Sequence, residues 1–271
     1  MNSRRFYLIV SSLLLLAFMA ACGASPAGSS TKYSATNPPI SATTATHPPV
    51  SASSGMGGCT NAYFPVSSGN SWSYSSSGGV LGPYTYTRTV TDASDAGFTT
   101  SNLSSLGTGT TANTKWKCKD GRLAALEAGS NSLNVSTSNV KITSTSITAD
   151  GYNIPNTFDT GTTWSEKVTV NDTVQSSGRS LDSRIDSKVD CSAAGSESVS
   201  VPAGTFDAVK VTCTETVAVS ELVHATPVPA GVPSTLDITN WYAKGVGLVK
   251  SVRVSSAGGT ATIVLTQYKV Q

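Results

Sequence analysis

The clearest pattern in the chain is an alternation of apolar and polar positions between residues 181 and 191. Every second position is charged and the sign alternates, in the order Asp182, Arg184, Asp186, Lys188 and Asp190. The opposite positions include Leu181, Ile185, Val189 and Cys191. Because successive strand residues point to opposite faces, this segment predicts a half-buried antiparallel strand with a solvated ionic face.

Similar runs recur along the chain, at 71–76, 84–91, 98–103, 114–118, 135–148, 162–170, 197–201, 206–219, 236–242, 248–254 and 260–270. Gly, Pro, Asn or Asp separates most of them, as hairpin turns require. Only residues 122–128 could form a helix, a short one between glycines. About a dozen strands without crossover helices predict an all-β fold, a large antiparallel sheet curled into a barrel or half-barrel.

The first 21 residues form a different kind of segment. Arg4 and Arg5 precede an apolar stretch that ends at Met19 and two alanines. The stretch has about 16 residues and a membrane-spanning helix needs about 20, so residues 1–21 predict a secretory signal peptide. Met19 to Gly23 resembles the bacterial lipobox, which implies a lipid on Cys22 and anchoring to the outer face of a bacterial membrane. The alternative is cleavage by ordinary signal peptidase, leaving Cys22 as an unpaired thiol.

Residues 22–58 carry no apolar periodicity. They are rich in Ala, Ser, Thr, Pro and Gly, with paired prolines at 38–39 and 48–49. Such a segment buries too little apolar surface to offset its ordering entropy, so we expect a disordered tether. Residues 59–271 then form a single antiparallel β domain.

Composition narrows the class of partner. The chain has 43 serines and 36 threonines, and only 13% of its residues are charged, which disfavours a helical protein. Its formal charge of +2 comes from Arg4 and Arg5, so the exported chain is balanced. This balance excludes a charge-driven nucleic-acid binder. It favours contacts with a partner through aromatic side chains, loops or an apolar interior.

Four cysteines follow Cys22, an even number in an exported chain, and they allow three pairings. Residues 201–206 predict a tight turn centred near 203, which brings Cys191 within about two residues of facing Cys213. A bulge at 192–195 would absorb the offset. We therefore expect the disulfides Cys191–Cys213 and Cys59–Cys118.

Aromatic residues gather around a glycine-rich loop at 78–83. If that hairpin is centred on Val80, Tyr74 faces Tyr86 and Trp72 faces Arg88, giving an aromatic pair and a cation–π pair. We interpret this pattern as a cross-strand ladder. The alternative is an exposed strip that also includes Tyr84 and would suit sugar rings or lipid.

Chemistry-bearing side chains are otherwise sparse. Glu215 falls on the apolar face of its strand and is the carboxylate that could line a cavity, unless that face turns to solvent there. The two histidines, His47 and His224, leave one candidate base for a Ser-His-Asp relay, and no Gly-x-Ser-x-Gly turn is present. We expect no enzymatic activity, no metal and no cofactor.

Three segments carry a resemblance: Tyr63-Phe64-Pro65-Val66 with Gly69-Asn70-Ser71-Trp72-Ser73-Tyr74, then Val201-Pro202-Ala203-Gly204-Thr205-Phe206, then the run from Trp241 to Lys250. In this order they resemble a group of uncharacterised bacterial envelope proteins and lipoproteins, and the resemblance implies an antiparallel β domain without an assigned activity. Half-barrel lipoprotein carriers are similar at the level of architecture only. We expect a non-enzymatic, membrane-anchored lipoprotein with a binding or structural role in the envelope. The alternative is a carrier of an apolar ligand or lipid.

Overall fold

The computed structural model describes residues 57–79, 82–105, 111–126, 140–176, 178–256 and 258–271. All of them belong to one compact unit, Pro49–Gln271. The predicted signal peptide, Cys22 and nearly all of the predicted tether lie outside the described residues. So do residues 127–128 of the possible helix and residues 135–139 of a predicted strand.

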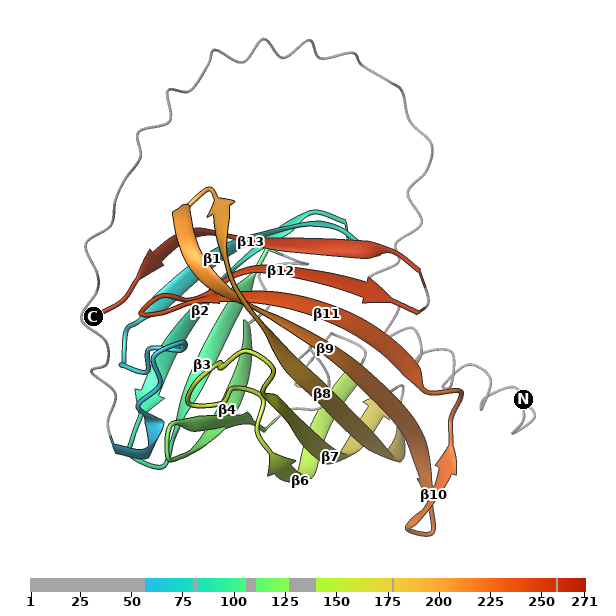
Figure 1. Cartoon of the computed structure of the whole chain (residues 1–271). Coiled ribbons are helices and arrows are strands. Elements are labelled where there is room, and N and C mark those ends of the chain that lie inside the picture. The colour runs from blue at the N-terminus through green and yellow to red at the C-terminus, as the bar shows by residue number, and fades with distance from the viewer. Residues whose placement is uncertain (1–56, 80–81, 106–110, 127–139, 177, 257) are drawn as a thin grey trace. The chain divides into compact units, whose positions relative to one another are not determined.

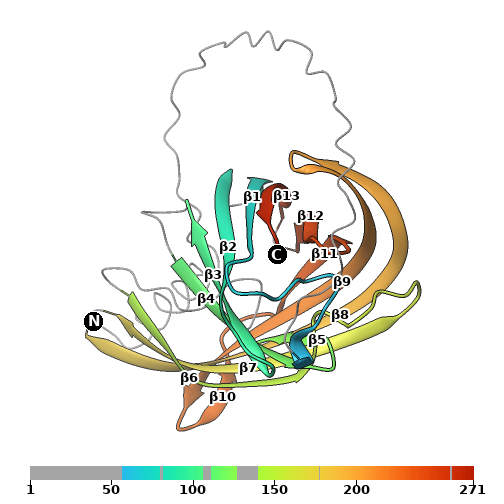
Figure 2. The same ribbon diagram turned by 90° about the vertical axis from the view of Figure 1, so that its left-hand side faces the viewer.

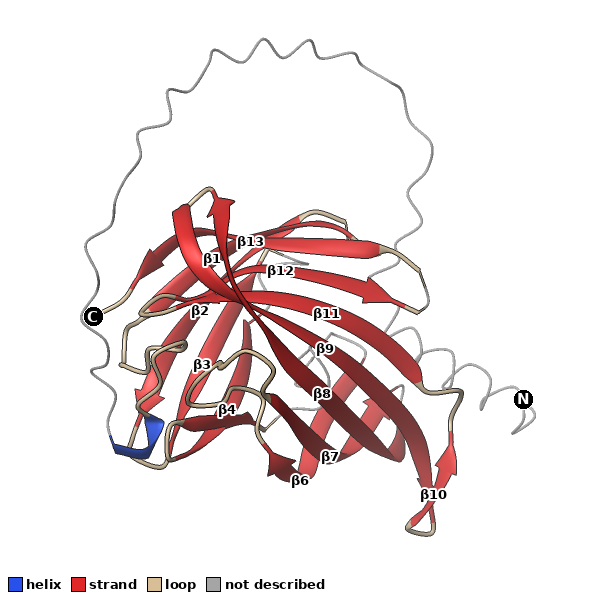
Figure 3. Cartoon of the chain, in the orientation of Figure 1, coloured by secondary structure: helices blue, strands red, loops and turns tan. Residues whose placement is uncertain are grey.

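The domain is built almost entirely of strands (Figures 1 and 3). After a 3-10 turn, η1 (Gly57–Cys59), the strands are β1 (Ser71–Gly78), β2 (Tyr84–Ala93), β3 (Gly97–Ser104), β4 (Thr111–Lys119), β5 (Arg122–Ala125), β6 (Val140–Gly151), β7 (Thr163–Ser176), β8 (Arg179–Val201), β9 (Gly204–Val223), β10 (Thr226–Pro229), β11 (Ser234–Ala243), β12 (Gly247–Ser255) and β13 (Thr260–Lys269). Among the described residues, no helix is long and apolar enough to cross a membrane.

All the strands belong to one antiparallel sheet, in the order β5-β4-β3-β2-β1-β13-β12-β11-β9-β8-β7-β6, and β10 pairs with β9. Figure 2 shows how strongly the sheet curls. Its two ends meet where Leu123 in β5 exchanges backbone hydrogen bonds with Ile154, just after β6, at N···O distances of 2.8 and 3.1 Å. The sheet is therefore nearly closed into a barrel, which confirms the predicted fold class.

The possible helix at 122–128 is wrong for its described part. Residues 122–125 form β5, which pairs with β4, and Leu123 and Ala125 alternate inward with 0% and 1% exposure. A helix of seven residues gains little because its first turn is costly to nucleate. Pairing with an existing strand edge supplies backbone hydrogen bonds without that nucleation cost.

The charged segment behaves as its pattern predicts. It forms the first half of β8, with Ile185 and Cys191 buried. On the outer face Arg184 pairs with Asp186 at 2.8 Å and Lys188 pairs with Asp190 at 2.6 Å. The predicted strands at 181–191 and 197–201 are one strand, because the segment between them only shifts register, between Ala193 and Gly195.

Aromatic side chains fill much of the interior. The Phe64 ring packs against the rings of Trp72, Phe98 and Trp116, at centroid distances of 5.3–5.5 Å. The indole of Trp72 donates a hydrogen bond to the carbonyl of Val246 at 2.6 Å. This core connects β1, β3, β4 and the turn before β12.

Candidate functional site

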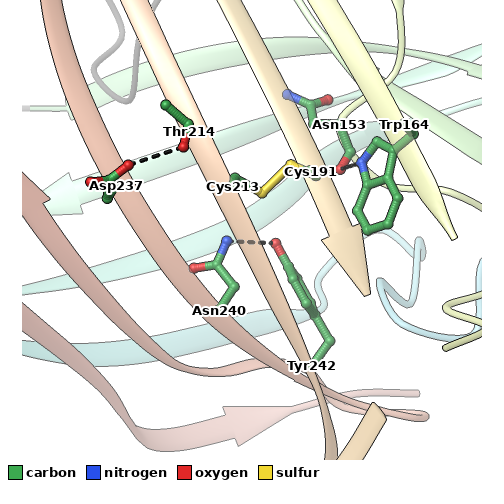
Figure 4. The surroundings of a disulfide bond; sticks show 8 residues. All are labelled: Asn153, Trp164, Cys191, Cys213, Thr214, Asp237, Asn240 and Tyr242. Carbon is green, nitrogen blue, oxygen red and sulfur yellow. Dashed lines mark hydrogen bonds between the residues drawn. A yellow bond between two sulfur atoms is a disulfide. The ribbon is translucent and has the colours of Figure 1, made fainter. Parts of the chain in front are cut away.

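Two disulfides hold the walls of the interior. Cys59 bonds to Cys118, which ties the start of the domain to β4, and Cys191 bonds to Cys213 between β8 and β9 (Figure 4). Both are the pairs that the sequence favours. Cys191 and Cys213 are direct cross-strand partners, because the bulge at 193–195 absorbs the offset as predicted.

The aromatic hairpin is confirmed in its register. Tyr74 faces Tyr86 with ring centroids 4.9 Å apart, and Trp72 faces Arg88. Trp72 and Tyr74 are each only 2% exposed, so the exposed-strip alternative is wrong for them. Tyr84 and Tyr86 are partly buried. Trp72, Tyr74 and Tyr86 form part of the inner packing, and the Tyr84 ring lies 6.1 Å from that of Tyr86. None of these four candidate binding residues lines the cavity described next.

The interior contains a cavity of about 140 Å³. Its walls combine apolar, aromatic and charged side chains from both halves of the sheet. The lining residues are Phe64, Arg88, Trp116, Asn153, Ile154, Glu166, Val168, Ser187, Val189, Cys191, Val211, Cys213, Glu215, Ile238, Asn240, Tyr242 and Leu248.

Two glutamates line the cavity from the strands on either side of β8. Glu166 in β7 and Glu215 in β9 are both register partners of Val189 in β8, so the three residues form one row across the sheet. With strands about 4.8 Å apart, the two glutamate Cα atoms are separated by about 10 Å. The side chains are 3% and 4% exposed. Glu215 therefore faces inward, as its position on an apolar face suggested, but it shares the cavity with a second carboxylate.

Hydroxyl and amide groups surround this row. Ser187, one inward position before Val189 in β8, donates a hydrogen bond to Oε1 of Glu215 at 3.2 Å. In β11, Nδ2 of Asn240 donates to the hydroxyl oxygen of Tyr242 at 3.4 Å (Figure 4). The cavity wall thus offers neutral hydrogen-bonding groups beside the carboxylates.

The basic side chain of the cavity lining comes from the other half of the sheet. Arg88 in β2 lines the cavity, and its Nε donates to Oδ1 of Asn102 at 2.9 Å. Burial raises the pKa of Tyr242, while Arg88 and Arg253 act in the opposite direction. The same balance of burial against these two guanidinium groups raises the pKa of Tyr86. Both phenols therefore stay protonated at neutral pH.

The polar side chains that line the cavity differ in burial. Glu166, Glu215 and Ser187 are buried, whereas Arg88, Asn240 and Tyr242 remain partly exposed. Among the described residues, no group of three or more His, Cys, Asp or Glu side chains is placed to hold a metal ion.

Sequence reasoning missed Glu166 as a site residue. In the predicted strand at 162–170 it occupies the same face as Trp164, Val168 and Val170, so the alternation that identified Glu215 could have identified it too. Nothing local to Asn240, Tyr242 or Ser187 indicates that they share a cavity. Their meeting depends on how the sheet curls.

Residues 90–258 match the model of the DUF3108-like family. This is more than half of the chain, and the chain therefore belongs to that family. The match includes Glu166, Glu215 and the disulfide between β8 and β9, but it begins just after Arg88. None of the curated proteins matches the chain.

Two solved structures are similar in fold. One, from Bacteroides fragilis NCTC 9343, is described as a "putative exported protein with YmcC-like fold"; it is 15% identical, with a TM-score of 0.51, over 77% of this chain and 99% of the other. The second, a "putative lipoprotein" from Parabacteroides distasonis ATCC 8503, is 20% identical, with a TM-score of 0.48 and the same coverage. The first likeness supports the curled antiparallel sheet as a recurring fold.

Proposed function

We propose that this member of the DUF3108-like family is a non-enzymatic lipoprotein of the bacterial envelope. Lipid on Cys22 anchors it to the outer face of a membrane, and its barrel domain has a binding role. The observation that carries the binding role is the interior cavity, which two buried glutamates line.

A purely structural barrel has no need of such groups. Burying a carboxylate is costly, and replacing buried ionic groups with well-packed apolar ones is often neutral or stabilising. Glu166 and Glu215 share one row with Val189, and buried Val168 and Ile185 show that apolar side chains fit the same inner face. Two acids retained beside a cavity support a role in recognition.

The volume of the cavity indicates the size of the ligand. Pockets for drug-sized molecules span roughly 300–1,000 Å³, and this cavity holds about 140 Å³. Together with the charged walls, this supports a small polar ligand rather than the acyl chains that a lipid carrier would shelter.

Three features support export. The leader at 1–21 has the layout of a signal peptide, the two disulfides suit an oxidising compartment, and a similar structure from Bacteroides fragilis is described as exported. The lipobox-like residues around Cys22 then support a lipid anchor over free secretion.

The anchor is tested by expressing the full chain in a bacterium and measuring the intact mass of the membrane-extracted protein. We expect loss of residues 1–21 and the added mass of acyl chains. The Cys22→Ala variant should lose that added mass and leave the membrane fraction. An unmodified Cys22 in the wild-type protein would refute the anchor.

The lipid-carrier alternative is tested on the same preparation. The protein is extracted with organic solvent and the extract is analysed by mass spectrometry, with the Cys22→Ala protein as the control for covalently attached lipid. We expect no stoichiometric lipid from the control. A stoichiometric lipid from both proteins would favour the carrier.

A further inference from the structure

The chemistry of the cavity identifies a class of ligand. Resting on the binding role proposed above, we propose that the cavity binds a small molecule bearing a primary ammonium group, with Glu166 and Glu215 as its anionic partners.

Charge is the first argument. Among the lining residues, Glu166 and Glu215 are acidic and Arg88 is basic, so the walls carry an excess of one negative charge when all three are ionised. The two carboxylates belong to one cross-strand row of one wall, on either side of Val189, and both side chains are buried. In surroundings of low dielectric constant a cation gains most beside such groups, because solvent screens the attraction least.

The second argument comes from the aromatic lining. Phe64, Trp116 and Tyr242 border the same cavity as the two acids. Aromatic faces attract cations, and they attract ammonium groups more strongly when water is excluded. Trp116 is held in place by a hydrogen bond of 3.1 Å from its indole nitrogen to the hydroxyl of Thr100. Carboxylates combined with fixed aromatic rings favour an organic cation over a hydrated inorganic one.

Size is the third argument. A cavity of about 150 Å³ engineered into another protein accommodates benzene, so a space of about 140 Å³ suits a ligand of about six heavy atoms or slightly more. A calcium ion would require about six to eight oxygen ligands, which a wall shared with three aromatic rings and a guanidinium does not favour.

Arg88 distinguishes two sources of the same ammonium chemistry. A simple amine would use only the carboxylates and the aromatic rings. An amino acid would also present a carboxylate, and a guanidinium is a strong partner for that group. Arg88 lies on β2, whereas the glutamates lie on β7 and β9. Removing the guanidinium therefore tests the carboxylate end of the ligand, and removing a glutamate charge tests its ammonium end.

The experiment uses the full chain in detergent micelles and three probes of similar length: n-butylammonium, 4-aminobutyrate and uncharged n-butanol. Binding is followed by tryptophan fluorescence, since Trp116 lines the cavity, and by ligand-observed NMR. Both ammonium probes should saturate the wild-type protein with a Kd of about 1 mM or tighter, and n-butanol should bind at least about tenfold more weakly.

The variants Glu166→Gln and Glu215→Gln should each weaken both ammonium probes by at least about tenfold. Arg88→Gln should weaken the binding of 4-aminobutyrate alone if the carboxylate of this probe contacts the guanidinium. Unchanged binding of both probes would instead indicate a simple amine as the natural ligand. The matched control is Asp237→Asn, which removes a carboxylate from the outer face of β11, where Thr214 contacts it at 3.0 Å. It should bind like the wild type.

Several results would overturn the inference. They are the absence of saturable binding of either ammonium probe up to about 10 mM, equally tight binding of n-butanol, and unchanged binding in both glutamate variants. If circular dichroism shows that those variants misfold, the Trp116→Phe variant tests where the probes bind. The fluorescence response to the probes should be mostly lost in this variant if they bind in the cavity. An intact response would show that they bind elsewhere and would overturn the inference.

The outcome is separable from that of the lipid anchor. Acylation of Cys22 is measured by mass on the same preparation. An acylated protein that ignores both ammonium probes would refute this inference and leave the anchor standing. An unacylated protein that binds both probes would refute the anchor and leave this inference standing.

Discussion

The two disulfides should contribute unequally to stability, and their loop lengths set the order. Cys59 and Cys118 are 59 residues apart in sequence, whereas Cys191 and Cys213 are 22 apart. In the chain-entropy model a cross-link stabilises by removing loop-closure entropy from the unfolded chain. This gives about 4.2 kcal/mol for the longer loop and about 3.4 kcal/mol for the shorter one.

The structure adds a reason to expect an even larger gap. Cys191 and Cys213 already face each other across the β8–β9 hairpin, whose two-residue turn at 202–203 is local. Residual hairpin structure in the denatured state would leave less loop-closure entropy for that cross-link to remove, and so reduce its contribution to stability. Cys59 lies in η1 before the first strand, so its tether to β4 has no such local support.

The perturbation is a pair of double variants, Cys59→Ala/Cys118→Ala and Cys191→Ala/Cys213→Ala. Urea unfolding is followed by circular dichroism and tryptophan fluorescence together, which tests two-state behaviour. Reduced wild-type protein is the control, because it loses both cross-links and keeps every sulfur atom, and so separates the entropy term from the cavities that alanine leaves.

The expected result is a larger loss of unfolding free energy for the Cys59/Cys118 variant, by about 1 kcal/mol or more. The reasoning is refuted if the hairpin pair costs as much as the long-range pair. It is also refuted if the reduced protein and the oxidised protein have the same urea midpoint.

Three further predictions concern single residues. Trp72→Phe should cost about 1–3 kcal/mol in urea unfolding, because it leaves the buried Val246 carbonyl without its donor; a change below 0.5 kcal/mol or so would contradict this. Ala225→Gly should raise the thermal midpoint by relieving a positive φ of 64° in the turn between β9 and β10, a gain of up to about 1 kcal/mol, while an equal or lower midpoint would argue against strain there. Burial raises the pKa of Asp172, so its ionised form destabilises the folded state above that pKa; Asp172→Asn should be the more stable protein in urea at pH 7, with the difference fading as the pH falls toward 3.8, and a pH-independent difference would contradict the assignment.

Much of the strand pattern could be predicted because it is local. The alternation at 181–191 needs only the period of a strand, and the facing of Tyr74 and Tyr86 needs only a turn position. The helix at 122–128 failed for the complementary reason. Four of its residues pair with β4 and one of them, Leu123, also pairs with Ile154, and no local pattern reveals either partner.

The candidate site divides in the same way. Glu215 stands out because a carboxylate interrupts an apolar face, and Glu166 interrupts the apolar face of the predicted strand at 162–170 in the same way. Arg88 attracted attention only as a neighbour of Trp72 across a hairpin. That it lines a cavity with both glutamates follows from the curl of the whole sheet.

The sequence by itself determined the β class, the register of two hairpins and the pairing of Cys191 with Cys213, because side-chain alternation and turn chemistry act between residues close along the chain. Only the tertiary structure decided that β1 pairs with β13, that Leu123 meets Ile154, and that charged groups from β2, β7 and β9 enclose one small space. Those contacts depend on twist accumulated across a dozen strands. No short segment of the sequence encodes that sum.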